Sequence, residues 1–211
     1  MTRQRIGLIA GAAAAVLVAA GAITYAVAED SGGSTQLTVP GAESADAGFA
    51  RDMAVHHQQA VEMSYIVRDR TGNAEVRRLA YDIAQTQANQ RGMLLGWLDL
   101  WQLPKVSANP PMTWMGMGDM PERGDGSLMP GMATNTELRK LQALNGKQAE
   151  ILYLQLMTDH HKGGIHMAEG CVAKCTVGVE KRLAQGMVDA QQSELQVMAG
   201  MLKERGAKPR S

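Results

Sequence analysis

Apolar residues recur along most of the chain at intervals of three and four, the period of an α-helix, and the alternation typical of β-strands is almost absent. This pattern predicts long helices at roughly 45–70, 74–102, 147–172 and 178–205. A shorter helix is predicted at about 135–145, where Thr134 and Glu137 have the spacing of a capping box. Gly72 is expected to end the first helix in a left-handed conformation. We therefore expect an all-α protein.

The beginning of the chain has the pattern of an export segment. Arg3 and Arg5 precede an uncharged run, Ile6 to Ala28, which is long enough to cross a hydrocarbon core of about 30 Å. Positive charge before the run keeps the N-terminus in the cytoplasm and exports the remainder. Ala26-Val27-Ala28 also fits a signal-peptidase site, so residues 1–28 are a signal peptide or a transmembrane anchor, and we favour the anchor.

A flexible tether is expected over residues 29–43, and the folded domain over 44–207. The domain contains a repeat, in which residues of the first half recur 104 positions later. Met53, His56, His57 and Met63 recur as Met157, His160, His161 and Met167, and Leu79, Ala80, Gln87 and Leu98 recur as Leu183, Ala184, Gln191 and Leu202. A period this long indicates two similar helical hairpins rather than a solenoid. One hairpin cannot bury its apolar stripe alone, so we expect the two to form a four-helix bundle.

The repeated histidines and methionines share one face of their predicted helices. At 100° per residue, those of the first copy fall within an arc of about 120°, the width of a buried face. Imidazole and thioether together suit copper, since Met favours Cu(I) and His binds both oxidation states. The candidate metal ligands are therefore His56, His57, His160, His161, Met53, Met63, Met157 and Met167. His166 lies off this face and is a secondary candidate, at the surface or outside the ligand shell.

The same pattern has a structural interpretation without metal. Methionine is an adaptable core filler, and buried imidazoles can bond to backbone carbonyls or to polar side chains. Gln87, Gln191 and Glu194 on the partner helices are the side chains expected to bond them.

A methionine-rich loop is expected at 104–134, between the two hairpins. It is rich in Pro and Gly, and its secondary metal candidates are Met112, Met115, Met117, Met120, Met129 and Met132. Thioethers are uncharged and need no deprotonation, so this loop could hold Cu(I) weakly and exchangeably. The alternative is a loop folded over the bundle, with methionines as pliable apolar contacts.

Cys171 and Cys175 are predicted where the third long helix ends. An oxidising compartment favours a disulfide that pins the following turn. An intact helix holds Cβ atoms four residues apart too far from one another, so the disulfide requires the helix to unwind there. The alternative is a pair of Cu(I) thiolates.

Composition excludes several classes of protein. Lys and Arg number 21, as do Asp and Glu, so the chain lacks the basic excess typical of nucleic-acid binders. There is no phosphate-binding loop, no nucleophile elbow and no H-E-x-x-H zinc motif in the sequence. There is also no E-x-x-H, which di-iron centres of the ferritin type require. We therefore expect a binding protein and not an enzyme.

The two His-His blocks, Met129-Pro130-Gly131-Met132-Ala133 and the pairs Gln87/Gln90 and Gln191/Glu194 resemble the family known as domain of unknown function 305, over approximately residues 45–205. The resemblance implies a ferritin-like four-helix bundle, exported or membrane-anchored in bacteria. In some members it implies copper binding and copper tolerance. Gln90 departs from the acidic residue often found at its position, which puts a carboxylate role in the first hairpin in doubt.

We expect an extracytoplasmic protein that sequesters or transfers copper, either anchored to the outer face of the cytoplasmic membrane or secreted. Its expected partners are the metal ion and, through the N-terminal helix, the membrane. A second copy of the chain or a metal-exchanging protein is left open. The alternatives are a structural or partner-binding bundle of the cell envelope without metal, and a metal-dependent redox enzyme.

Overall fold

The computed structural model describes residues 39–119 and 124–210, and within these ranges the chain is helical and has no β-strand. The helices are α1 (Ala45–Arg68), α2 (Ala74–Leu100), the short 3₁₀ helix η1 (Thr113–Met115), α3 (Asn135–Ala143), α4 (Gly146–Lys174) and α5 (Gly178–Glu204). All five predicted α-helices are therefore present, with ends close to those expected. The predicted export helix lies outside the described residues.

Local side-chain bonds fix where three of the helices begin. The Ser44 hydroxyl accepts from the N–H of Ala47 at the start of α1, and the Asn73 carbonyl oxygen accepts from two N–H groups of α2. Thr134 and Glu137 form the predicted capping box of α3. Each of these side chains satisfies a backbone N–H that has no partner within its helix.

The prediction for Gly72 is wrong. Helix α1 already ends at Arg68, where the N–H of Asp69 donates to carbonyls of the last turn, and Gly72 is not among the residues with positive φ. The chain leaves α1 through ordinary right-handed backbone, so glycine's freedom is not used there.

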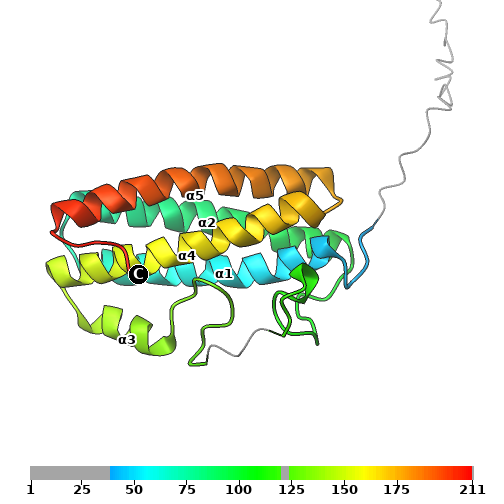
Figure 1. Cartoon of the computed structure of the whole chain (residues 1–211), viewed down its shortest axis with the longest axis horizontal. Helices are drawn as coiled ribbons and strands as arrows, with labels where there is room; N and C mark the ends of the chain where they lie inside the picture. Colours follow the sequence, from blue (N-terminus) through cyan, green and yellow to red (C-terminus); the bar gives the residue numbers. More distant parts are fainter. Residues whose placement is uncertain (1–38, 120–123, 211) are drawn as a thin grey trace, which may run out of the picture. The chain divides into compact units, whose positions relative to one another are not determined.

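The long helices form two antiparallel hairpins, α1 with α2 and α4 with α5, which lie side by side (Figure 1). The hairpins meet along α1 and α4, which run in opposite directions. At one end, Asp46 of α1 accepts from the N–H groups of Thr176 and Val177, just beyond α4. At the other end, the N–H of Gly146 donates to the carbonyl of Arg70 at 2.7 Å. The result is a four-helix bundle.

The interior contains two apolar clusters, with the repeated histidines between them along α1 and α4. One cluster includes Met63 and Met157, and the other includes Met53 and Met167. None of these methionines shares a cluster with its own counterpart in the repeat. Antiparallel packing explains this, because the early part of α1 lies beside the late part of α4. All four methionines are fully buried.

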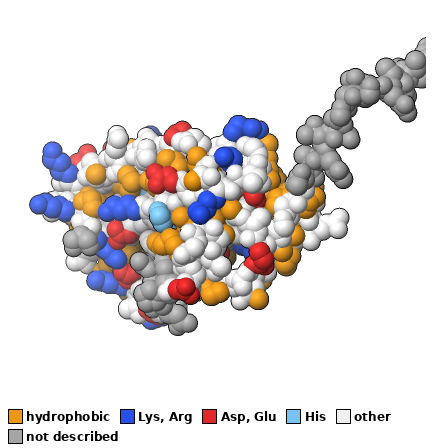
Figure 2. Space-filling view, turned by 45° about the vertical axis from the view of Figure 1, so that its right-hand side comes forward, with side chains coloured by type: hydrophobic (Ala, Val, Ile, Leu, Met, Phe, Trp, Pro, Cys, Tyr) orange, Lys and Arg blue, Asp and Glu red, His pale blue; other side chains and the backbone are white. Residues whose placement is uncertain are grey.

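On the face drawn in Figure 2, acidic and basic side chains are interspersed, as the balanced charge of the chain leads one to expect. Within residues 39–119 and 124–210, no helix combines the length and the apolar character needed to span a membrane.

Candidate metal centre

The four repeated histidines lie inside the bundle, on the helices that join the two hairpins. His56 and His57 come from α1, His160 and His161 come from α4, and each is 0 % exposed. The rings of His56 and His160 lie face to face, with centroids 3.7 Å apart and an interplanar angle of 32°. The structure therefore brings these two imidazoles together.

Three of the imidazoles are oriented by oxygen atoms at Nε2. Nε2 of His56 lies 3.3 Å from the carbonyl oxygen of Pro130, and Nε2 of His160 lies 2.9 Å from the carbonyl oxygen of His56. A carbonyl oxygen can only accept, so Nε2 carries the proton in both rings. Nε2 of His161 lies 2.6 Å from a carboxylate oxygen of Glu194. In the neutral form of each ring, Nδ1 then keeps a free lone pair.

These lone pairs have no hydrogen-bond partner in the protein. The buried unpartnered atoms include Nδ1 of His56, His160 and His161 and both ring nitrogens of His57. The side-chain amide of Gln87 and the side-chain oxygen Oε1 of Gln191 are also buried without partners. An unsatisfied buried polar group costs about 1–3 kcal/mol. Five such nitrogens in one interior are therefore expensive unless something binds them.

Burial favours the neutral form of His56, His57 and His160. Desolvation lowers the pKa of His56 to about 4 and that of His57 to about 3, and neighbouring imidazoles lower both further. The pKa of His160 lies well below its usual value, for the same two reasons. Nitrogen lone pairs are therefore available for a metal ion at neutral and mildly acidic pH.

The ring nitrogens do not form a closed cluster of three. Among the described residues, the group of three His, Cys, Asp or Glu ligand atoms lying within 4.8 Å of one another comprises Cys171, Cys175 and Glu180. Coordination by the histidines would thus be completed by thioethers, which the buried methionines on either side can offer.

The segment Met129-Pro130-Gly131-Met132-Ala133 closes over this part of the bundle. The side-chain amide of Gln59 bonds both the N–H and the carbonyl of Ala133, at 2.7 and 2.9 Å. At Gly131, where φ is +81°, a Cβ would lie 2.4 Å from the carbonyl oxygen of Asp159. The sequence pointed to this segment through its family resemblance and through Met129 and Met132 as secondary metal candidates, but it did not predict the contact with His56.

The secondary candidates lie in different surroundings. Met129 and Met132 are buried in the same cluster as Met53 and Met167, and Met112 is buried there too. Met115 and Met117 are half-buried and pack against that cluster. The described loop methionines thus pack on the bundle. Met120 lies outside the described residues, and His166 is exposed.

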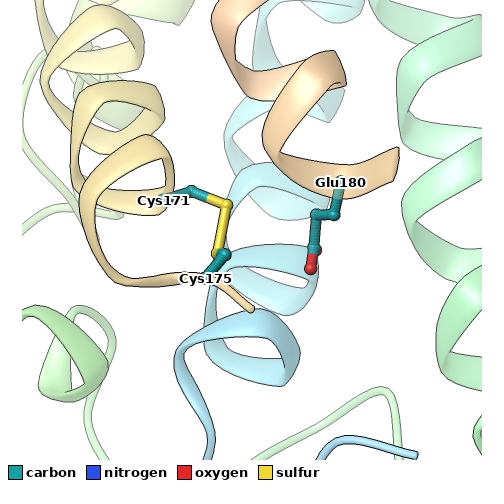
Figure 3. A group of neighbouring side chains, drawn as sticks. All are labelled: Cys171, Cys175 and Glu180. Atoms are coloured by element: carbon teal, nitrogen blue, oxygen red, sulfur yellow. A yellow bond between two sulfur atoms is a disulfide. The ribbon is translucent and has the colours of Figure 1, made fainter. Parts of the chain in front are cut away.

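Cys171 and Cys175 are joined by a disulfide, with a sulfur–sulfur distance of 2.16 Å (Figure 3). Helix α4 ends at Lys174, and Cys175 has extended backbone, φ −65° and ψ 151°. The helix therefore ends where the disulfide requires it to. The carboxyl group of Glu180, from the first turn of α5, lies beside the two sulfur atoms.

Comparisons with known proteins find relatives by sequence and by structure. The model of the domain of unknown function DUF305 matches residues 46–202. A crystal structure of a DUF305 protein from Streptomyces coelicolor, named a secreted protein, is 71 % identical, with a TM-score of 0.76, over 81 % of this chain and 99 % of that one. A DUF305 fragment from Deinococcus radiodurans is 28 % identical, with a TM-score of 0.62, over 76 % and 96 %.

A more distant structure shares the fold. CopM in its Cu(I)-bound form is 17 % identical, with a TM-score of 0.57, over 75 % of this chain and 96 % of that one. The Cu(II)-bound form of CopM aligns similarly, at 19 % identity and a TM-score of 0.58. No curated protein matches the chain.

Proposed function

Because this chain belongs to the DUF305 family, whose fold it shares with a protein solved with Cu(I) and with Cu(II), we propose that it is an exported copper-binding protein. Its cargo is copper, held between α1 and α4. The ligands are drawn from the four buried histidines and the four methionines that flank them. Its role is to sequester copper or to pass it on.

The observation that carries this proposal is the set of five buried imidazole nitrogens without partners. Three of these nitrogens belong to rings whose Nε2 lies against an oxygen atom. Metal-binding histidines are typically held in this way, because the oxygen fixes the tautomer and makes the other nitrogen more basic. The oxygen atoms of Pro130, His56 and Glu194 would have this role.

The donor types support copper over other metals. Imidazole binds both oxidation states of copper, and thioether favours Cu(I). Met53 and Met167 lie on one side of the imidazoles, and Met63 and Met157 on the other. Either pair could complete the coordination of Cu(I), and Met129 and Met132 adjoin the first pair.

The location of the protein is part of the proposal. The relative named as secreted supports export. We propose that residues 1–28 direct export as a signal peptide or a membrane anchor, that residues 29–43 tether the domain, and that a ferritin-like bundle over 44–207 binds the metal. The loop over 104–134 is proposed as a secondary Cu(I) site.

Titration of the full-length chain with Cu(I), against a chromophoric chelator, tests the proposal. We expect tight binding by the wild type and at least a tenfold loss of affinity when His56 and His160 are both replaced by Ala. The matched control is His166→Ala, which removes an exposed imidazole from the same helix as His160 and should leave affinity unchanged. Circular dichroism checks that each variant is folded.

Replacing His56, His57, His160 and His161 together by Ala locates the binding. Tight binding retained by this variant would move the site to the loop methionines and overturn the assignment. An absence of binding by the wild type would favour the structural alternative, in which the imidazoles only bond the backbone. One observation favours that alternative, since two Nε2 atoms already bond carbonyls. Turnover of superoxide or peroxide by the copper-loaded protein would be needed to support the redox enzyme.

A further inference from the structure

A buried carboxyl group lies beside the disulfide, away from the histidines. Glu180 is 0 % exposed, and neither of its carboxyl oxygens accepts a hydrogen bond. One of these oxygens and the sulfur atoms of Cys171 and Cys175 all lie within 4.8 Å of one another. In Figure 3 the side chain of Glu180 extends from α5 into the space next to the sulfur–sulfur bond.

The neighbouring acid, Asp46, is already used by the fold. Its carboxylate accepts from the N–H groups of Thr176 and Val177, at 2.8 and 2.7 Å, and from the Thr176 hydroxyl at 3.1 Å. Asp46 thereby ties the start of α1 to the turn between α4 and α5. Neither oxygen of Glu180 accepts a hydrogen bond in this way, and its protonated carboxyl instead bonds to Asp46.

The surroundings of Glu180 oppose its ionisation. Desolvation by burial raises the pKa of Glu180 to about 9, and the charge of Asp46 and a hydrogen bond to it add to the rise. An ionised carboxyl without a counter-charge is costly in this interior. A cation bound at this point would remove the cost.

We propose that reduction of the disulfide converts Cys171, Cys175 and Glu180 into a site for a divalent metal ion, of which zinc is the best fit. Two thiolates and one carboxylate are a donor set that zinc accepts, in tetrahedral geometry. The carboxylate distinguishes this site from a purely thiolate Cu(I) site. While the disulfide is intact, neither sulfur is a thiolate and the site cannot form.

The redox step balances with a dithiol as the reductant. The dithiol gives two electrons, the bond between the two cysteine sulfurs breaks, and each sulfur takes up one proton. The dithiol itself becomes a disulfide. When zinc binds, the two thiols and the Glu180 carboxyl release their protons. The oxidation state of one cysteine pair would thus decide whether the ion is held.

This inference does not rest on the copper proposal, because it uses none of the histidines or methionines. Comparing one chain in its two oxidation states also separates the two sites, since the histidines are the same in both. Any zinc bound by imidazole contributes equally and cancels in the difference.

The test is a zinc titration of the full-length chain, oxidised and after reduction by a phosphine. We expect the reduced protein to bind one more equivalent of zinc than the oxidised protein. Cobalt(II), used as a spectroscopic substitute, should give a thiolate charge-transfer band in the reduced form only. Equal zinc stoichiometry in the two states, or no such band, would overturn the proposal.

The variant Glu180→Gln tests the carboxylate. It should weaken the additional zinc site at least tenfold, whereas the matched variant Glu169→Gln, at an exposed position of α4, should not. Unchanged zinc affinity in Glu180→Gln would remove Glu180 from the site. If that variant does not fold when reduced, the cobalt band of the reduced wild-type chain still decides whether the thiolates bind.

Discussion

At the scale of single residues, the distinctive feature is a set of fully buried imidazoles between two apolar clusters that contain methionines. Charging His56, His57 or His160 inside the bundle is unfavourable, because burial removes the water that would solvate the cation. The unfolded chain has no such restriction. Protons therefore favour the unfolded state, and the histidines link stability to pH.

For the metal-free protein, we expect the free energy of unfolding to decrease as pH falls from about 6.5 to about 4. His56 titrates near 4 and His57 near 3 in the folded state, whereas unfolded imidazole titrates near 6.5. Between these values the unfolded chain binds more protons, so each imidazole lowers stability by up to about 1.4 kcal/mol per pH unit. Urea unfolding at several pH values measures this.

The control for the pH profile is His166→Ala, which should keep the same slope because His166 is exposed. The raised pKa of Glu180 makes its contribution to the free energy of unfolding increase as pH falls. The contributions of several imidazoles outweigh that of this single carboxyl over this range. A free energy of unfolding that is constant between pH 7 and 5 would contradict the lowered pKa values.

We expect Glu180→Gln to stabilise the oxidised protein at alkaline pH. The folded pKa of about 9 lies above the unfolded value near 4.5. The stability of the wild type is therefore fullest below pH 4.5 and is lost as pH rises towards 9. Because Gln is neutral at every pH, the variant should be more stable by at least about 1 kcal/mol at pH 8, with the difference shrinking towards pH 4.5. Urea unfolding at both pH values provides the comparison, and a constant difference would contradict it.

Sequence alone could select these residues but not their chemical state. The spacing of His56 and His57 places them on a buried face, and the repeat doubles the set. The tautomer of His56 depends on the carbonyl of Pro130, which is 74 positions away and reaches His56 only in the folded chain. No local pattern encodes that contact.

At the scale of elements, helix periodicity predicted the five α-helices well, because amphipathic stripes and caps are local properties. The end of the first helix lies within two residues of the predicted one, but the left-handed conformation expected at Gly72 was wrong. The segment over 129–133 was the larger omission. It docks on α4 through backbone contacts, which leave little trace in the pattern of apolar residues.

The docking of this segment on α4 predicts that replacing glycine by alanine changes stability in opposite directions at two positions. Gly163→Ala should destabilise the protein by about 1–3 kcal/mol, because a Cβ there would lie 2.0 Å from the carbonyl oxygen of Pro130. Gly200→Ala, on the exposed side of α5 with nothing within 4 Å, should instead stabilise it by up to about 1 kcal/mol. Chemical denaturation measures both. A stabilising Gly163→Ala would show that the segment moves away at little cost.

At the scale of the whole molecule, a buried carboxylate links the ends of the two hairpins. It forms an ion pair within one hairpin and a hydrogen bond to the other. The carboxylate of Glu150, on α4, accepts a hydrogen bond of 2.7 Å from Nε of Arg205, which follows α5 directly. It also accepts from the hydroxyl of Thr71, which lies between α1 and α2. Three separate segments therefore converge on one carboxylate. Its side chain is 9 % exposed, and that of Arg205 is 7 % exposed.

We expect Glu150→Ala to lower the free energy of unfolding by about 3–5 kcal/mol, because Arg205 would remain buried without its counter-charge. Glu204→Ala is the control, since Glu204 approaches the same arginine at 3.9 Å but is 68 % exposed. It should cost less than about 1 kcal/mol. Urea unfolding at pH 7 compares the two variants. Equal losses in the free energy of unfolding would show that burial does not strengthen the contact between Glu150 and Arg205.

The antiparallel meeting of α1 and α4 has a consequence for how such a centre can diverge. In a symmetric dimer of single hairpins, every substitution would be made on both sides at once. Joining the two copies in one polypeptide removes that constraint, so each half can change alone. The chain already displays such asymmetry, for a carboxylate faces His161 from position 194 whereas the equivalent position of the other copy is Gln90. The covalent link thus lets selection change the surroundings of the histidines on α1 and of those on α4 separately.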